Sequence, residues 1–167
     1  FFFFLKFVDN QTLLILDIDD TLLIPSQTLG RDVWFLDRLN LHKQSLKGEE
    51  ALEKAISEWE AVRHLTTVQI VEEGTEKIVA DLQKQNIPVM GLTTQGLALA
   101  TRTVLQLASL GIDLSKTPPS NQDHYFINRH GVLYRSGILF TSGTPKGPAI
   151  VKLFDILNYF PKRVLFI

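Results

Sequence analysis

Apolar and polar positions follow two different patterns along this chain, and the two patterns distinguish predicted strands from predicted helices. The run Leu13–Leu16 is apolar throughout, which is typical of a strand buried on both faces of a parallel sheet. Similar short runs predict further strands over 87–92 and 163–167. Apolar residues instead recur every three or four positions in the predicted helices, which are 49–65, 76–86, 97–110 and 147–160.

The order of these elements predicts an α/β fold, a Rossmann-like parallel sheet with helices on both faces. Two helix ends support it, because Thr75 suits an N-cap and Gly111 suits a left-handed C-cap. The region 125–141 contains short β-rich runs around glycines, so we expect a β-hairpin insertion there. Residues 26–46 show loose helical spacing without a clean strand pattern, and the helix 49–65 follows, so we expect a small helical insertion over 26–70.

Three carboxylates follow the first strand directly. Because side chains alternate along a strand, Asp17 and Asp19 are expected to point the same way while Ile18 points into the core. Two like charges this close repel unless a cation binds them or one is protonated, and such a pair can serve as nucleophile and general acid/base. The alternative is a solvated acidic turn in which Asp20 or Thr21 bonds to nearby backbone N–H groups.

The segment Asp17-Ile18-Asp19-Asp20-Thr21 resembles the first motif of the haloacid dehalogenase (HAD) superfamily, most of whose members are Mg²⁺-dependent phosphohydrolases. The resemblance implies that Asp17 attacks phosphorus to form an aspartyl-phosphate. It implies that Asp19 protonates the leaving oxygen and later activates water. It also implies that 1–25 and 71–167 form the core and that 26–70 is a cap-type insertion.

Two later positions match further motifs of this family. Thr93 matches the Thr or Ser at the end of the second strand that binds a phosphoryl oxygen, and Thr94 is the neighbour that could exchange roles with it; alternatively, one of them caps the next helix. Lys146 matches the Lys that neutralises nucleophile and phosphate. A cation before a helix faces the positive end of the helix dipole, so we expect Lys146 to pair with Asp17; the alternative is a solvated loop Lys.

The resemblance implies Mg²⁺ as the cofactor, with Asp17 and Asp19 as its ligands. The family has one or two more acids after the next strand, but here that strand is Val164–Ile167 and the sequence stops. We therefore expect a C-terminally truncated fragment of a longer protein, in which the activity resides. Because Mg²⁺ needs octahedral oxygen coordination, we expect this fragment to bind it weakly.

Composition narrows the choice of partners and location. Lys and Arg total 17 against 18 Asp and Glu, so no strong field favours nucleic acid as a partner. The absence of Cys excludes a disulfide scaffold and thiolate metal sites. No run approaches the roughly 18 apolar residues of a membrane span. We expect a cytoplasmic protein, or an exported one if Phe1–Leu5 is the remnant of a signal peptide.

The predicted function is hydrolysis of a phosphomonoester, on a small phosphorylated molecule or a phosphoprotein. The segment Gly131–Gly147 resembles a subgroup of uncharacterised bacterial members of the family, so the substrate is not indicated. Dehalogenation is less favoured, because the family's dehalogenases lack the second Asp, which is present here as Asp19. The alternative of another class is a degenerate binding module that kept the fold without turnover. The sequence does not indicate an oligomeric state.

Overall fold

A computed structural model of the chain describes residues 8–167 and divides into two compact units. Residues 24–69 form one unit from a single continuous segment. Residues 8–23 and 70–167 form the other, which we call the core unit. The insertion expected at 26–70 differs from the observed segment by two residues at its start and one at its end. The segment Phe1–Leu5, interpreted above as a signal-peptide remnant, lies outside the described residues.

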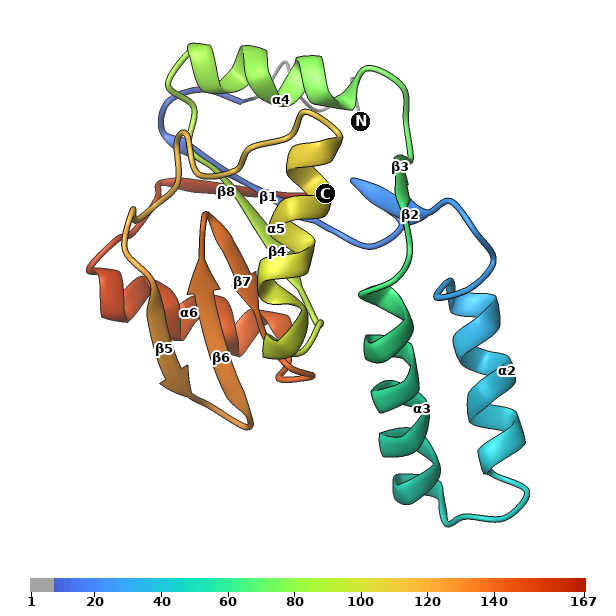
Figure 1. The fold of residues 1–167 in the computed structure, drawn as a ribbon. Helices are drawn as coiled ribbons and strands as arrows, with labels where there is room; N and C mark the ends of the chain where they lie inside the picture. The colour runs from blue at the N-terminus through green and yellow to red at the C-terminus, as the bar shows by residue number, and fades with distance from the viewer. Residues whose placement is uncertain (1–7) are drawn as a thin grey trace. The chain divides into compact units, whose positions relative to one another are not determined.

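The core unit is built on a six-stranded sheet with the order β5-β6-β7-β4-β1-β8 (Figure 1). Four strands are parallel, namely β1 (Thr12–Asp17), β4 (Val89–Thr93), β7 (Ile138–Phe140) and β8 (Arg163–Phe166). Two antiparallel strands extend the sheet beyond β7, namely β5 (His124–Ile127) and β6 (Gly131–Arg135). The predicted α/β class is confirmed.

Strand β1 lies inside this sheet and is covered on both faces. Leu13 and Ile15 belong to a buried cluster that also contains residues of β4, β6, β7 and of helix α6 (Lys146–Leu157). Leu14 and Leu16 point to the opposite face and are equally inaccessible. In Figure 1, helix α5 (Ala100–Ser109) lies in front of the sheet and α6 lies behind it. The apolar run therefore forms the centre of the core, as the pattern predicted.

Several local predictions are confirmed and others are wrong by a few residues. Gly111 has φ +80 just after α5, as a left-handed helix end requires. Helix α4 (Thr75–Lys84) begins at Thr75, but its N-cap is Gly74 with φ 88, so the expected Thr75 cap is wrong. The Thr75 hydroxyl instead donates to the Glu72 carbonyl at 2.7 Å. The helix expected at 97–110 is divided into a 3-10 turn, η1 (Leu97–Leu99), and α5.

Strand β7 joins the hairpin to the parallel sheet. It pairs antiparallel with β6 on one side and parallel with β4 on the other. All three of its residues are buried, which a strand at the edge of a separate hairpin would not achieve. The expected hairpin insertion is therefore continuous with the main sheet.

The unit 24–69 is a helical hairpin. Helices α2 (Asp32–His42) and α3 (Gly48–Arg63) pack against each other, and Arg38 Nε lies 2.7 Å from Glu58 Oε2. The Trp59 indole donates to the Gly30 carbonyl at 2.8 Å. The paired strands β2 (Leu23–Pro25) and β3 (Val68–Ile70) contain both boundaries between the units.

Candidate functional site

The sheet reverses its strand order next to β1. After β1 the chain adds β4 and then β5, β6 and β7 on one side of it, and it then passes through α6 to β8 on the other side. In open α/β sheets, ligands bind at such a switch point, beyond the carboxyl ends of the strands. Asp17 is the last residue of β1, so its side chain lies where this topology places a ligand site.

The Asp17 carboxylate is paired with Lys146. Its Oδ2 lies 2.5 Å from Lys146 Nζ, and its Oδ1 accepts the Ile18 N–H at 2.8 Å. The two side chains are only 31% and 25% exposed, so solvent screens the pair less than it screens a surface ion pair. Lys146 is the first residue of α6, where the helix dipole disfavours a cation. Asp17 offsets that effect, and the expected ion pair is found.

A tight turn holds Asp19 just beyond the end of β1. The Ile18 carbonyl accepts the N–H groups of Leu22 and Leu23 at 3.0 and 3.1 Å, so the backbone closes on itself within five residues. Asp20 has φ 56, a left-handed conformation that Asp tolerates better than most residues. The Ile18 side chain is fully buried, as predicted. Asp19 is thus carried by a turn anchored in the core.

The Asp19 carboxylate contacts two residues at the carboxyl end of β4, Thr93 within the strand and Gln95 just after it. Thr93 Oγ1 donates to Asp19 Oδ2 at 3.2 Å, and Gln95 Nε2 lies 3.0 and 2.9 Å from Oδ1 and Oδ2. The Thr93 hydroxyl also accepts the Gln95 N–H at 3.1 Å. Thr93 is 1% exposed. The structure therefore brings Thr93 to Asp19, whereas Lys146 joins Asp17.

Backbone hydrogen bonds tie the loop before α6 to the end of β4. The Thr141 N–H donates to the Thr93 carbonyl at 3.0 Å, and the Gly143 N–H donates to the Thr94 carbonyl at 3.1 Å. The Thr94 residue is exposed, unlike Thr93. The segment after Thr93 and the segment before Lys146 are therefore hydrogen-bonded to each other at the carboxyl end of the sheet.

Sequence reasoning assigned no role to Gln95 or Thr103. Both are buried, and the Thr103 hydroxyl lies 2.5 Å from Gln95 Oε1. The only signal for Gln95 was its position directly after Thr93 and Thr94 at the end of a strand. Thr103 lies on α5 and gave no signal, because a single Thr inside a helix has many structural uses.

The described residues do not complete a magnesium site. Mg²⁺ takes six oxygen ligands in near-octahedral geometry, of which waters and substrate can supply several. Residues 8–167 contain no group of three or more acidic, His or Cys side chains placed to hold a metal ion. Asp17 is engaged by Lys146, and both oxygens of Asp19 contact Gln95. Two carboxylates with these partners can contribute ligands, but they do not form a site by themselves.

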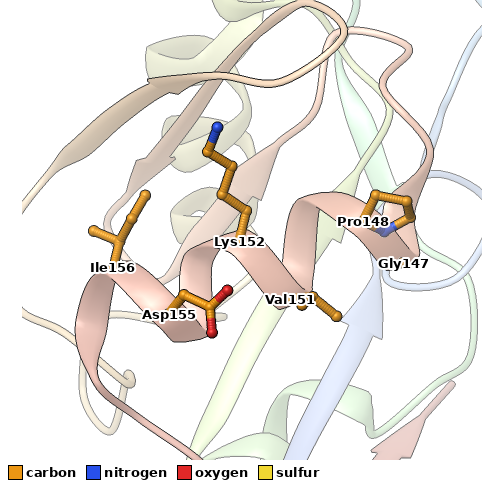
Figure 2. A pocket seen from close by; sticks show the side chains of 6 residues that line it. All are labelled: Gly147, Pro148, Val151, Lys152, Asp155 and Ile156. Atoms are coloured by element: carbon orange, nitrogen blue, oxygen red, sulfur yellow. The ribbon is translucent and has the colours of Figure 1, made fainter.

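A separate surface pocket of about 850 Å³ lies along α6 (Figure 2). It is lined by Gly147, Pro148, Val151, Lys152, Asp155 and Ile156. The Lys152 amine donates to the Ile127 carbonyl at 2.7 Å. None of the four predicted site residues lines this pocket. The carboxyl end of the sheet is therefore the better candidate.

Comparison with known proteins places the chain in a family. A family model matches residues 5–167, and the family is described as "Protein of unknown function (DUF2608)". The chain belongs to this family. The description of the DUF2608 family names no reaction, so the chemistry of the chain has to be argued from its own residues.

Curated relatives of this DUF2608 chain occur in Chlamydia under the name "Putative outer membrane protein", and three of them are compared with it below. Two are from Chlamydia pneumoniae, at 31% identity over 92% of the chain and 24% over 98%. One is from Chlamydia trachomatis serovar D, at 23% over 95%. The matches cover 58%, 64% and 60% of the relatives, so the chain spans about three fifths of their length. None of the helices described within 8–167 is long and apolar enough to cross a membrane.

Proposed function

We propose that this chain carries the site of a phosphomonoester hydrolase that works through an aspartyl-phosphate on Asp17. The observation that carries the proposal is the 2.5 Å ion pair between Asp17 and Lys146, two residues 129 positions apart in the sequence. The pair lies at the switch point of the sheet, half-buried, with a second carboxylate two residues away on a turn. A nucleophilic carboxylate, a cation and a second acid are the groups that this reaction needs.

In the first step, an Asp17 carboxylate oxygen attacks phosphorus and the bond from phosphorus to the ester oxygen breaks. The leaving oxygen takes a proton from the Asp19 carboxyl and departs as an alcohol. In the second step, water attacks the phosphorus of the acyl-phosphate while the Asp19 carboxylate takes its proton. Inorganic phosphate leaves and both acids return to their starting state. Asp19 can serve both steps because the first step leaves it ionised, and the second step requires an ionised carboxylate to accept the proton of water.

Lys146 and Thr93 support these steps in different ways. Lys146 is positioned to neutralise charge that gathers on Asp17 and on the phosphoryl oxygens, an electrostatic contribution that grows in a partly dehydrated site. Thr93 is occupied by Asp19 and by the Gln95 N–H in this structure. Direct binding of a phosphoryl oxygen by Thr93 would require it to exchange the Asp19 contact, whereas Thr94 is exposed without any rearrangement.

Mg²⁺ dependence is part of the proposal for the full-length protein. When bound, the ion would supply further neutralisation of phosphate charge. No step above depends on it, and the described residues offer only Asp17 and Asp19 as carboxylate ligands. Hydrolysis that is lost on chelation and restored by added Mg²⁺ supports the dependence, while hydrolysis unaffected by chelation contradicts it.

The first prediction tests the nucleophile by replacing Asp17 with Asn in the full-length protein. We expect hydrolysis of 4-nitrophenyl phosphate to fall by about three orders of magnitude, because a neutral amide cannot form the acyl-phosphate. Asp81→Asn is the matched control, since Asp81 also pairs with a lysine, Lys84, at 2.8 Å but on the exposed surface of α4. It should leave the rate unchanged. Circular dichroism checks that both variants fold, and turnover by Asp17→Asn above a tenth of wild type contradicts the assignment.

A binding module without turnover is the second candidate, and one observation favours it. The described part of the chain provides no third metal-binding side chain near the two acids. A full-length wild-type protein that binds phenyl phosphate in calorimetry but hydrolyses neither it nor 4-nitrophenyl phosphate would support the module and exclude the enzyme.

The location of the protein is a further part of the proposal. The printed names of the Chlamydia relatives favour an exported protein, whereas the sequence of this chain alone favours the cytoplasm. We propose export of the full-length protein. Fractionation of cells that express it from its native gene, followed by immunoblotting, decides between the two compartments.

A further inference from the structure

The pair Gln95 and Thr103 is buried against the site, and the reaction described above gives it no role. Gln95 is 3% exposed and Thr103 is 1% exposed. Burying an amide and a hydroxyl is costly unless their hydrogen bonds are made. Here the two side chains hydrogen-bond to each other, and the Gln95 amide also hydrogen-bonds to Asp19.

The Thr103 contact determines which end of the amide faces Asp19. The Thr103 hydroxyl donates to Gln95 Oε1 at 2.5 Å, so the NH₂ end of the amide is directed at the carboxylate. The reverse orientation would set the amide oxygen against two carboxylate oxygens, with no proton to share when Asp19 is ionised. The hydroxyl on α5 therefore orients the amide.

The amide in turn restricts the carboxylate. Gln95 Nε2 lies 3.0 Å from Asp19 Oδ1 and 2.9 Å from Oδ2, so the nitrogen approaches both oxygens almost equally. The terminal torsion of Asp is broad and costs little to rotate in the absence of such a contact. Hydrogen bonds to a charged group are stronger than neutral ones. Thr93 adds a contact to Oδ2 only.

We propose that Gln95 is a positioning residue for Asp19, and that the hydrogen bond from Thr103 fixes the orientation of the Gln95 amide. The inference rests on the proposed function, because it concerns the residue that exchanges protons there. Gln95 fixes the plane of the Asp19 carboxyl group, so that the proton is delivered along one direction. Misplacement of a catalytic group by about 1 Å can cost on the order of 100-fold in rate. The hydrogen bonds from Thr103 to Gln95 and from Gln95 to Asp19 thus connect α5 to the turn after β1.

The experiment compares two substrates in the full-length protein with Gln95 replaced by Met. Glycerol 2-phosphate has a poor alkoxide leaving group that needs a proton, whereas 4-nitrophenyl phosphate has a stable leaving group that does not. We expect kcat for glycerol 2-phosphate to fall by about 10- to 100-fold, since acid catalysis contributes on the order of 10²- to 10⁴-fold. The burst of 4-nitrophenol released in the first turnover reports phosphorylation of Asp17 alone, because the later attack of water also uses Asp19 and is shared by both substrates. The rate of this burst should fall by less than about 3-fold.

Matched variants separate positioning from a structural role. Gln83→Met removes another buried amide, whose Nε2 donates to the Asp113 carbonyl at 2.7 Å, and it should change neither rate. Thr103→Val removes the hydroxyl that orients Gln95 and should reproduce part of the loss on glycerol 2-phosphate. Thr103→Ser keeps the hydroxyl and should restore the rate. These substitutions at 103 also provide the test if Gln95→Met does not fold.

Each outcome distinguishes the inference from the function on which it rests. Wild-type protein that hydrolyses neither phosphate removes the proposed function and the role of Gln95 with it. Wild-type hydrolysis with equal losses in glycerol 2-phosphate turnover and in the 4-nitrophenol burst of Gln95→Met, or with a change confined to KM, overturns the inference and leaves the function standing. Thr103→Ser that is as impaired as Thr103→Val overturns the orienting role of the hydroxyl.

Discussion

At the scale of single residues, Lys146 is the residue whose position needs the most explanation. It begins a helix at the end where a cation is unfavourable, and its Nζ lies 2.5 Å from Asp17 and 5.3 Å from the centroid of the Phe166 ring. The Asp17 charge and the face of the Phe166 ring both favour a cation there. A side chain held in this way is already oriented before any phosphate arrives.

Replacing Lys146 with Met in the full-length protein should lower kcat for 4-nitrophenyl phosphate by about 100-fold, the usual scale for losing one electrostatic contact to a developing charge. Lys152→Met is the matched control. Lys152 lies on the same helix, and its amine donates a hydrogen bond to the backbone carbonyl of Ile127 rather than to a carboxylate. It should retain the wild-type rate. Equal losses in the two variants would show that the effect comes from the helix rather than from the Asp17 pair.

The charged residues of the site could be predicted from the sequence, and Thr93 from its match to a motif, whereas Gln95 and Thr103 could not. Asp17 and Lys146 each occupy a place where a bare charge is unfavourable, so a partner could be expected for both. Gln95 and Thr103 carry no charge, and nothing local to them requires a distant partner. Their contacts depend on residues 76 and 8 positions away, which only the folded chain brings together.

At the scale of elements, the turn between β6 and β7 depends on a glycine. Ser136 and Gly137 have φ 49 and 77, as a two-residue hairpin turn requires. A Cβ on Gly137 would lie 2.1 Å from the Leu114 carbonyl oxygen, which is backbone and cannot move aside easily. The Gly137 carbonyl also accepts the Gly91 N–H at 2.8 Å. The turn is therefore packed from several sides.

Gly137→Ala should lower the free energy of unfolding by roughly 2–5 kcal/mol, combining left-handed strain with overpacking. Gly143→Ala is the matched control, since Gly143 has φ +74 with nothing within 4 Å of its Cβ position. It should lose only about 1 kcal/mol. Urea denaturation followed by circular dichroism measures both. Similar losses in the two variants would mean that the Leu114 backbone yields to the added carbon.

The elements themselves could largely be predicted, because their causes are local. The uniform run at Leu13–Leu16 marks a doubly covered strand, and the three- and four-residue spacing marks the helices. The pairing of β7 with β4 could not be predicted, since the segment Ile138–Phe140 is too short to show whether one or both of its edges are paired. The prediction of Thr75 as the N-cap of α4 is wrong because the helix is preceded by Gly74 in a left-handed conformation. This N-cap uses no side-chain hydrogen bond, which is the feature that the prediction relied on.

At the scale of the whole molecule, the unit 24–69 has an ion network of its own. Arg38 lies 2.7 Å from Glu58, and His42 lies 3.1 Å from it. The Arg38 hydrogen bond, followed by that of His42, lowers the pKa of Glu58 from 4.5 to about 2. The unfolded chain therefore binds more protons than the folded chain between these two values. Stability from Glu58 is present above pH 4.5 and is lost as the pH falls toward 2.

Glu58→Gln should remove that part of the pH dependence. We expect the urea midpoint of the wild-type chain to fall between pH 4.5 and pH 2.5 more steeply than that of the variant. Both tryptophans, Trp34 and Trp59, lie in this unit, so their fluorescence reports its unfolding. Glu60→Gln is a control on the same helix. Parallel curves for wild type and Glu58→Gln would contradict the assignment.

The two units differ in how their parts are spread along the chain, and that difference governs the order in which they form during synthesis. The two helices of 24–69 pack together within one continuous segment. In the core unit, by contrast, Leu14 of β1 pairs with Val89, 75 positions later, and with Leu165 of β8. At about 5–20 residues per second, the ribosome needs roughly 4–15 s to reach β4. During that interval the nascent chain presents Leu13–Leu16, an apolar run that is fully buried in the folded sheet, without a neighbouring strand. A chaperone that binds extended apolar segments would have its target at the very residues that later carry Asp17 into place.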